Sequence, residues 1–118
     1  MRFIFRRSPK RLKVNKFTED WKALQKNCAT RKTWPLALSQ ADALLDKALK
    51  QRRYKGKTTG ERLVAAQHDL SSNDTVWFSH KLCKKMNNID VRTIKKKDVA
   101  DALAGFREAL RDLGALEK

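Results

Sequence analysis

The sequence predicts an all-α fold, a bundle of about five helices that follows a basic, extended N-terminal arm. Only four Gly and two Pro interrupt the 118 residues, which favours long helices over a turn-rich β fold. Apolar residues recur three and four positions apart over long stretches, and no segment is a convincing strand. Because 41% of the residues are hydrophobic, we expect one domain with one core rather than a disordered chain.

The first two helices are predicted from their caps and apolar faces. Thr18 is an N-cap candidate followed by Glu19 and Asp20, which predicts a helix to about residue 29. Thr33 and Pro35 open a second helix, since Pro is tolerated in a first helical turn. Apolar residues at positions 38, 41, 44, 45, 48 and 49 continue this helix at the expected spacing.

Three further helices follow a basic loop, QRRYKGKTTG. Thr58 and Glu61 match a capping box, which predicts a third helix to about residue 70. A fourth is expected over residues 75–86, followed by the polar connector NNIDVRTIKKK. Asp98 is expected to cap the last helix, and Gly114 is expected to end it.

The charge distribution indicates the class of partner. The chain has a formal net charge of +15, and its first sixteen residues, MRFIFRRSPKRLKVNK, hold seven Lys or Arg and no acid. Such a chain repels itself, and a dense polyanion such as nucleic acid relieves the repulsion. We therefore expect residues 1–16 to be an arm that is disordered unless bound, and residues 17–118 to be the helical domain.

The predicted contacts to RNA are the cations of the arm and of three further clusters. Side chains of this kind bind phosphates without reading sequence. RNA is preferred over DNA because no helix-turn-helix, zinc finger or other groove-reading signature occurs. The predicted RNA-binding residues are Arg2, Arg6, Arg7, Lys10, Arg11, Lys13, Lys16, Arg52, Arg53, Lys55, Lys57, Lys81, Lys84, Lys85, Lys95, Lys96 and Lys97.

Other kinds of site are not expected. Cys28 and Cys83 lie far apart, without CxxC spacing or clustered His, so we expect free thiols, no metal and no cofactor. No apolar run approaches the roughly 20 residues that span a bilayer, and a cytoplasmic location is expected. Two alternatives remain open for the arm: a processed organelle targeting segment, or an amphipathic membrane anchor that uses residues 3–5, Leu12 and Val14.

Three long segments resemble a known group of small helical proteins. They are ADALLDKALKQRRYKGKTTGERLVAAQ, SSNDTVWFSHKL and DVADALAGFREALRDLGAL. The chain is similar here to the HEPN-like proteins of candidate-phyla bacteria, including the Saccharibacteria, over about residues 18–117. The resemblance implies a HEPN-like helical bundle, which often dimerises through its motif-bearing helices.

The same resemblance bears on catalysis. Active HEPN ribonucleases resemble one another in an R-x-x-x-x-H motif, and in this group the segment usually reads like HKLRNKIVHE. The resemblance implies that the Arg steadies a phosphate and the His moves protons while the ribose 2′-hydroxyl attacks the adjacent phosphorus. In this chain the stretch from His80 reads HKLCKKMNNI, with Cys83 at the Arg position and Asn88 at the His position. Neither replacement supplies the chemistry, so we expect a degenerate motif and no catalytic residue.

Three kinds of side chain near this motif have competing interpretations. His80 is expected to be a packed histidine bonded to a neighbour, with a substitute proton shuttle as the alternative. Cys83 is expected to be a small buried apolar side chain, although Lys84 and Lys85 could instead lower its pKa. All three Trp are expected in the core rather than as stacking platforms, with Trp34 the most exposed.

The leading hypothesis is therefore a non-catalytic RNA-binding protein, a component of or a factor bound to a ribosome or another ribonucleoprotein. Its partners would be ribosomal or other structured RNA and ribosomal proteins, with a homodimer possible away from the ribonucleoprotein. The alternatives are a divergent, metal-independent HEPN ribonuclease of toxin-like kind, and an inactive partner subunit of an active HEPN relative.

Overall fold

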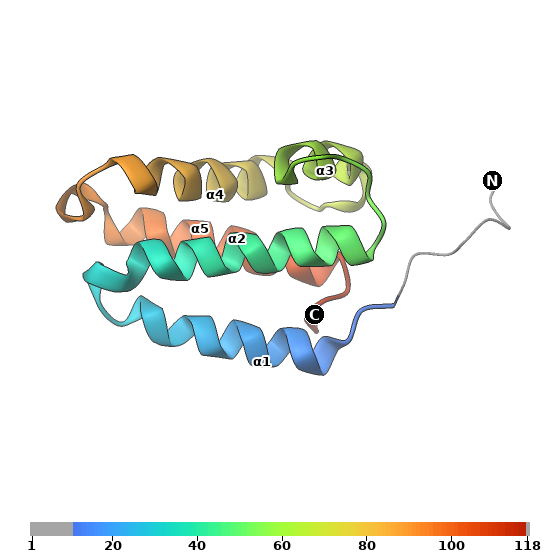
Figure 1. Ribbon diagram of the computed structural model, residues 1–118, viewed down its shortest axis with the longest axis horizontal. Helices are drawn as coiled ribbons and strands as arrows, with labels where there is room; N and C mark the ends of the chain where they lie inside the picture. Colours follow the sequence, from blue (N-terminus) through green and yellow to red (C-terminus); the bar gives the residue numbers. More distant parts are fainter. Residues whose placement is uncertain (1–10, 118) are drawn as a thin grey trace, which may run out of the picture.

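The chain forms a bundle of five α-helices over residues 11–117, the part that this computed structural model describes (Figure 1). Short 3₁₀ turns lie in three of the four connections between helices, and no strand occurs in this range, so the predicted all-α class is confirmed. The helices are α1 (Val14–Gln25), α2 (Trp34–Gln51), α3 (Thr59–Ala65), α4 (Asn73–Lys85) and α5 (Lys96–Asp112).

Helix α2 is the centre of the bundle. It packs against all four other helices, and Figure 1 shows it between α1 on one side and the α3 and α4 layer on the other. A helix in this position needs a broad apolar face. Its buried residues follow the three-and-four spacing and form one such face: Trp34, Ala37, Leu38, Ala41, Leu44, Leu45, Ala48 and Leu49.

Helix α1 begins earlier than its cap pattern predicts. It starts at Val14 rather than after Thr18, so residues 14–16 of the expected arm lie in the helix. Packing sets this start, because Leu12 and Phe17 are buried in the core with 5% and 1% of their surface exposed. Because Leu12 is buried in the core, it is not available as an apolar contact of an amphipathic membrane anchor.

Two later helix ends confirm their predicted caps. The N–H of Glu61 donates to the Thr58 hydroxyl at 3.1 Å, as a capping box requires. Gly114 follows α5 with φ +81, and the N–H of Ala115 donates to the Leu110 carbonyl at 2.8 Å in a Schellman motif.

Two other boundaries differ from the prediction. Helix α3 ends at Ala65, and a 3₁₀ turn over Gln67–Asp69 replaces its expected last turn. This turn brings Leu70, which is buried, back toward the core before α4 begins. Helix α5 starts at Lys96, so Asp98 lies inside the first turn, where its charge still favours the helix N-terminus.

The prediction that Trp34 is the most exposed tryptophan is wrong. Trp34 is only 7% exposed, because its ring turns toward the end of α1 and its Nε1–H donates to the Cys28 carbonyl at 3.0 Å. Trp21 is equally buried, which confirms the core interpretation for both residues. Trp77 is only half-buried against the core. Within residues 11–117, no helix is long and apolar enough to cross a membrane.

Candidate nucleic-acid interface

Among the described residues, most of the predicted RNA-contacting cations lie at the two ends of the bundle (Figure 1). Figure 1 shows that the start of α1, the loop after α2 and the end of α5 meet at one end, whereas the turn between α4 and α5 forms the other. The predicted contacts Arg2, Arg6, Arg7 and Lys10 lie outside the described residues. Lys16 lies on the first turns of α1 and pairs with Asp20 at 3.6 Å.

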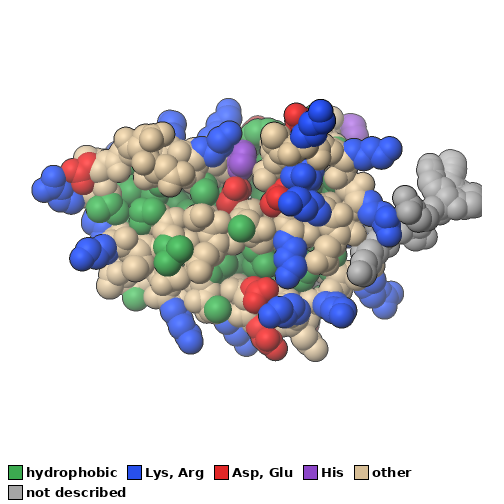
Figure 2. Space-filling model, viewed as in Figure 1, with side chains coloured by type: hydrophobic (Ala, Val, Ile, Leu, Met, Phe, Trp, Pro, Cys, Tyr) green, Lys and Arg blue, Asp and Glu red, His purple; other side chains and the backbone are tan. Residues whose placement is uncertain are grey.

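The first group, which we call the basic end, combines the start of α1 with the loop after α2. Lys13 precedes α1 in extended conformation, and the loop leaves α2 through a Schellman motif in which the Tyr54 N–H donates to the Leu49 carbonyl at 3.1 Å. In Figure 2, Lys and Arg side chains gather over this right-hand end. The basic end comprises Arg11, Lys13, Arg52, Arg53, Lys55 and Lys57.

Neighbouring carboxylates do not neutralise the basic end. Asp112 accepts hydrogen bonds from the backbone N–H and the hydroxyl of Ser71, both at 2.8 Å. Asp69 accepts from the Tyr54 hydroxyl, and Glu61 accepts from the backbone N–H of Lys57 at 2.9 Å. Each acid is thus held by a neutral donor. None of the six cations forms an ion pair with any of residues 11–117.

Arg53 has an unusual backbone conformation for its residue type. It follows the end of α2 with φ 68, in the left-handed region, where Gly is the usual residue. A side chain there costs about 1 kcal/mol relative to Gly. Arg53 is exposed and packs into no core, so folding does not explain the choice of residue. Residues held in an unfavourable backbone conformation of this kind cluster at functional sites.

The second group, which we call the lysine end, lies at the far end of the bundle. Its members are Lys81, Lys84, Lys85, Lys95, Lys96 and Lys97. Lys84 and Lys85 occupy the last turn of α4, where cations stabilise the helix. Lys97 is partly neutralised, because it pairs with Asp101 at 2.7 Å. Local helix electrostatics therefore accounts only for Lys84 and Lys85, because Lys95, Lys96 and Lys97 lie at the start of α5, where cations oppose the helix dipole.

A polar cluster joins α2, α3 and α4 on another part of the surface. His80 is 7% exposed, and its Nδ1 lies 2.8 Å from Oδ1 of Asp42. One turn later on α2, Asp46 accepts from Nη1 of Arg62 at 2.7 Å. His80 is thus the packed, bonded histidine that was expected, but sequence reasoning missed Asp42 because it lies 38 residues away. The available signal was two acids four residues apart, the only acids in this helix.

The thiol of Cys83 is not activated. Burial and the negative charge of Asp42 raise its pKa to about 11, despite the two lysines that follow it. The side chain packs against the core, as the apolar interpretation predicts, and the lowered-pKa alternative is wrong. Asn88 is exposed in the 3₁₀ turn Met86–Asn88 beyond α4. Among residues 11–117, no three His, Cys, Asp or Glu side chains are placed to hold a metal ion.

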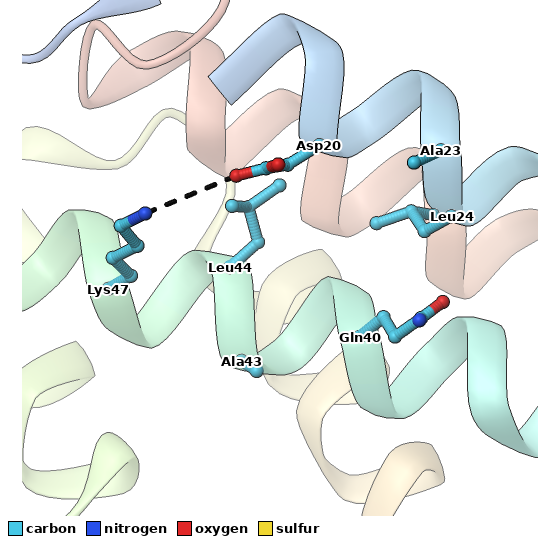
Figure 3. Close-up of a pocket in the computed structure, with 7 residues that line it drawn as sticks. All are labelled: Asp20, Ala23, Leu24, Gln40, Ala43, Leu44 and Lys47. Atoms are coloured by element: carbon cyan, nitrogen blue, oxygen red, sulfur yellow. Dashed lines mark ion pairs between the residues drawn. The ribbon is translucent and has the colours of Figure 1, made fainter. Parts of the chain in front are cut away.

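A shallow groove of about 310 Å³ between α1 and α2 has a different character (Figure 3). It is lined by Asp20, Ala23, Leu24, Gln40, Ala43, Leu44 and Lys47. Its one cation is not free for an anion, because Nζ of Lys47 lies 4.0 Å from Asp20 across the groove. The groove is therefore a poor phosphate site, and the basic end remains the best candidate interface.

Comparison with known proteins finds no similar protein. No family model, no curated protein and no solved structure matches this chain.

Proposed function

We propose that this protein is a non-catalytic RNA-binding protein that holds RNA phosphates through its basic end and its N-terminal arm. In this proposal it is a component of, or a factor bound to, a ribosome or another ribonucleoprotein. The observation that supports it is a set of six cations without ion-pair partners among residues 11–117, gathered where the acid-free arm joins the body.

The physical basis is counterion release. Each phosphate that a Lys or Arg neutralises releases condensed counterions, so affinity falls as salt rises. Cations already paired with carboxylates contribute less, because they must first give up a partner. The cations of the basic end keep this full contribution, as do those of the lysine end other than Lys97. What distinguishes the basic end is therefore its position where the acid-free arm joins the body (Figure 1).

The test measures affinity for a structured RNA against salt for two matched triple variants. One variant is Arg53→Gln, Lys55→Gln and Lys57→Gln at the basic end. The other is Lys84→Gln, Lys85→Gln and Lys96→Gln at the lysine end. Both lose three positive charges. We expect the basic-end variant to flatten the slope of log affinity against log salt by roughly 2–3 units, at about 0.7–0.9 per lost contact.

The lysine-end variant should change that slope by less than half as much, because its three lysines lie at the end of α4 and the start of α5, opposite the end where the arm joins the body (Figure 1). Equal changes in the two variants would show that net charge, not the basic end, governs binding. An affinity of the unmodified protein that hardly varies with salt would contradict the proposal itself. Co-sedimentation of the native protein with ribosomal subunits at low salt, and its release at high salt, would identify the ribonucleoprotein.

One observation favours a second candidate function, a metal-independent ribonuclease that uses His80. Asp42 lies 2.8 Å from Nδ1 of His80 and provides the orienting carboxylate that a catalytic histidine commonly has. Incubation with RNA and a chelator tests this idea. Cleavage that is lost in His80→Ala but retained in Lys81→Ala would support the enzyme, whereas no cleavage by the unmodified protein would reject it.

A further inference from the structure

We infer that the basic end contains one discrete phosphate pocket, built around Arg11 and Arg52, that holds a single phosphate group of bound RNA. This inference rests on the proposed function and locates the place where a phosphate is held in fixed geometry. The pocket has a volume of about 520 Å³, lies between the start of α1 and the ends of α2 and α5, and is lined by Arg11, Leu12, Val14, Arg52, Leu113 and Gly114.

The lining is positively charged and contains no acid. Its two arginines come from segments far apart in the chain, and its other side chains are apolar. Two carbonyl groups at these helix ends already accept backbone hydrogen bonds: that of Leu49 from the Tyr54 N–H at 3.1 Å, and that of Leu110 from the Ala115 N–H at 2.8 Å. Because the ends of α2 and α5 carry partial negative charge, the attraction for a phosphate comes from the two arginines.

The Arg52 guanidinium contacts a neutral group rather than a carboxylate. It interacts with the Tyr54 hydroxyl and acts to lower the pKa of that group, while its buried Nε has no hydrogen-bond partner among residues 11–117. A guanidinium without an ion-pair partner binds a phosphate oxygen strongly. Partial burial strengthens the attraction, since the charges meet in a lower effective dielectric than bulk water.

The apolar wall gives the pocket a fixed shape. Leu12 and Leu113 are buried, with 5% and 1% of their surface exposed, so neither can fold into the hollow without leaving the core. Leu12 also anchors the segment that carries Arg11, next to the start of α1. The lysines of the loop are exposed, whereas Arg52 is half-buried and lines the same pocket as Arg11.

The test uses the full chain and compares Arg52→Gln with Arg107→Gln. Arg107 is an exposed arginine of α5 outside the basic end, so both changes remove one charge. Arg52→Lys is a third variant that keeps the charge but loses the guanidinium. Far-UV circular dichroism checks that each variant is folded.

The first measurement is the Tm in inorganic phosphate and in NaCl of the same ionic strength. We expect phosphate to raise the Tm more than NaCl in the unmodified protein and in Arg107→Gln. That excess should disappear in Arg52→Gln and be reduced in Arg52→Lys. The same excess in all four proteins would overturn the pocket, because it would reflect general anion binding.

The second measurement is affinity for a short oligoribonucleotide with a 5′-hydroxyl or a 5′-phosphate. We expect Arg52→Gln to weaken binding about tenfold and Arg107→Gln about twofold, in line with one charge-assisted bidentate contact. A deficit shared by both oligonucleotides indicates an internal phosphate, whereas a deficit confined to the 5′-phosphate form indicates a terminal one.

The two proposals fail in different ways. Equal weakening by Arg52→Gln and Arg107→Gln, with a steep salt dependence retained, would overturn the pocket and leave RNA binding intact. No salt-dependent RNA binding by the unmodified protein, with a phosphate effect on Tm that Arg52→Gln abolishes, would overturn the RNA function and leave the phosphate pocket intact.

Discussion

At the scale of single residues, Arg53 shows how a residue type that does not suit its backbone conformation can indicate function. Its φ of 68 is the conformation that Gly adopts without cost, yet the residue is an exposed arginine. We predict that Arg53→Gly raises stability by about 1 kcal/mol, because Gly removes the left-handed penalty at this position. The same change should weaken RNA binding, because it removes a cation of the basic end.

Thermal unfolding and RNA titration measure the two effects of Arg53→Gly separately. Lys55→Gln is the matched control, because it removes a loop charge without altering a strained backbone position. It should weaken RNA binding and leave the Tm nearly unchanged. A Tm that falls in Arg53→Gly would show that the arginine stabilises the loop, and the functional explanation of its conformation would then be wrong.

The Cys83 thiol gives a second prediction at this scale. With a pKa of about 11, it should react with iodoacetamide at pH 8 roughly two hundred times more slowly than a thiol of ordinary pKa, about 8.5. The rate should still rise almost tenfold between pH 9 and pH 10. Asp42→Asn should accelerate the reaction, since it removes the charge that opposes the thiolate. Measurements in a Cys28→Ser background isolate this thiol, and a rate that levels off below pH 9 would contradict the assignment.

At the scale of the elements, α4 and α5 approach closely at Gly105. A Cβ at this position would lie 2.9 Å from the Thr75 carbonyl oxygen and would overlap the Ser79 hydroxyl. That hydroxyl is fully buried and lies within hydrogen-bonding distance of a carbonyl on each helix, 2.7 Å from that of Ala102 and 3.0 Å from that of Thr75. It therefore has little room to move aside.

We predict that Gly105→Ala destabilises the protein by about 2–3 kcal/mol, the usual cost of overpacking a tight core. Urea denaturation measures the free energy of unfolding. Gly60→Ala is the control, because a Cβ there would lie at an ordinary 3.5 Å from the Trp77 ring. Similar values for the two variants would mean that α4 and α5 are not packed as described.

The ion pair between Asp46 and Arg62 ties α3 to α2, and its side chains are 18% and 13% exposed. Burial acts to raise the pKa of Asp46, but hydrogen bonds from Thr59 and Lys50 and the charges of Arg62 and Lys50 outweigh burial and lower it. A lowered carboxyl pKa stabilises the fold above the unfolded pKa of about 4, and this stabilisation is lost as pH falls through the folded pKa.

We therefore predict that Asp46→Asn costs about 2 kcal/mol at pH 7, because it leaves a partly buried guanidinium unpaired. The difference from the unmodified protein should shrink as pH falls below about 4, where Asp46 itself becomes neutral. Asp101→Asn is the control, since its partner Lys97 is exposed and such pairs contribute little. A cost that stays constant down to acidic pH would show that the ion pair is not the cause.

At the scale of the whole molecule, the net charge of +15 opposes compaction even though the core is well formed. Screening by salt reduces this repulsion, and the repulsion outweighs the few ion pairs that salt also weakens. We predict that the Tm in the absence of RNA rises by several degrees between about 20 and 200 mM NaCl. Differential scanning calorimetry measures it, and a Tm that falls with salt would mean that ion pairs dominate.

The sequence predicted most of the helices because their evidence is local. The spacing of Leu38, Leu45 and Leu49 defines α2 without knowledge of its partners, and Thr58 and Gly114 act through neighbouring backbone groups. The start of α1 could not be predicted in this way, since Leu12 and Phe17 decide it by packing into the shared core. The HEPN-like resemblance, and the roles it implies for Cys83 and Asn88, stay predictions.

By itself, then, the sequence determined an all-α body and a strong excess of positive charge, because helical periodicity and composition depend only on residue type and order. Only the tertiary structure decided which cations gather at one end, that nearby acids are held by neutral donors, and that Asp42 lies beside His80. These are relations between residues far apart in the chain. Burial and distance set their energies, and the packing of α2 against its neighbours determines both.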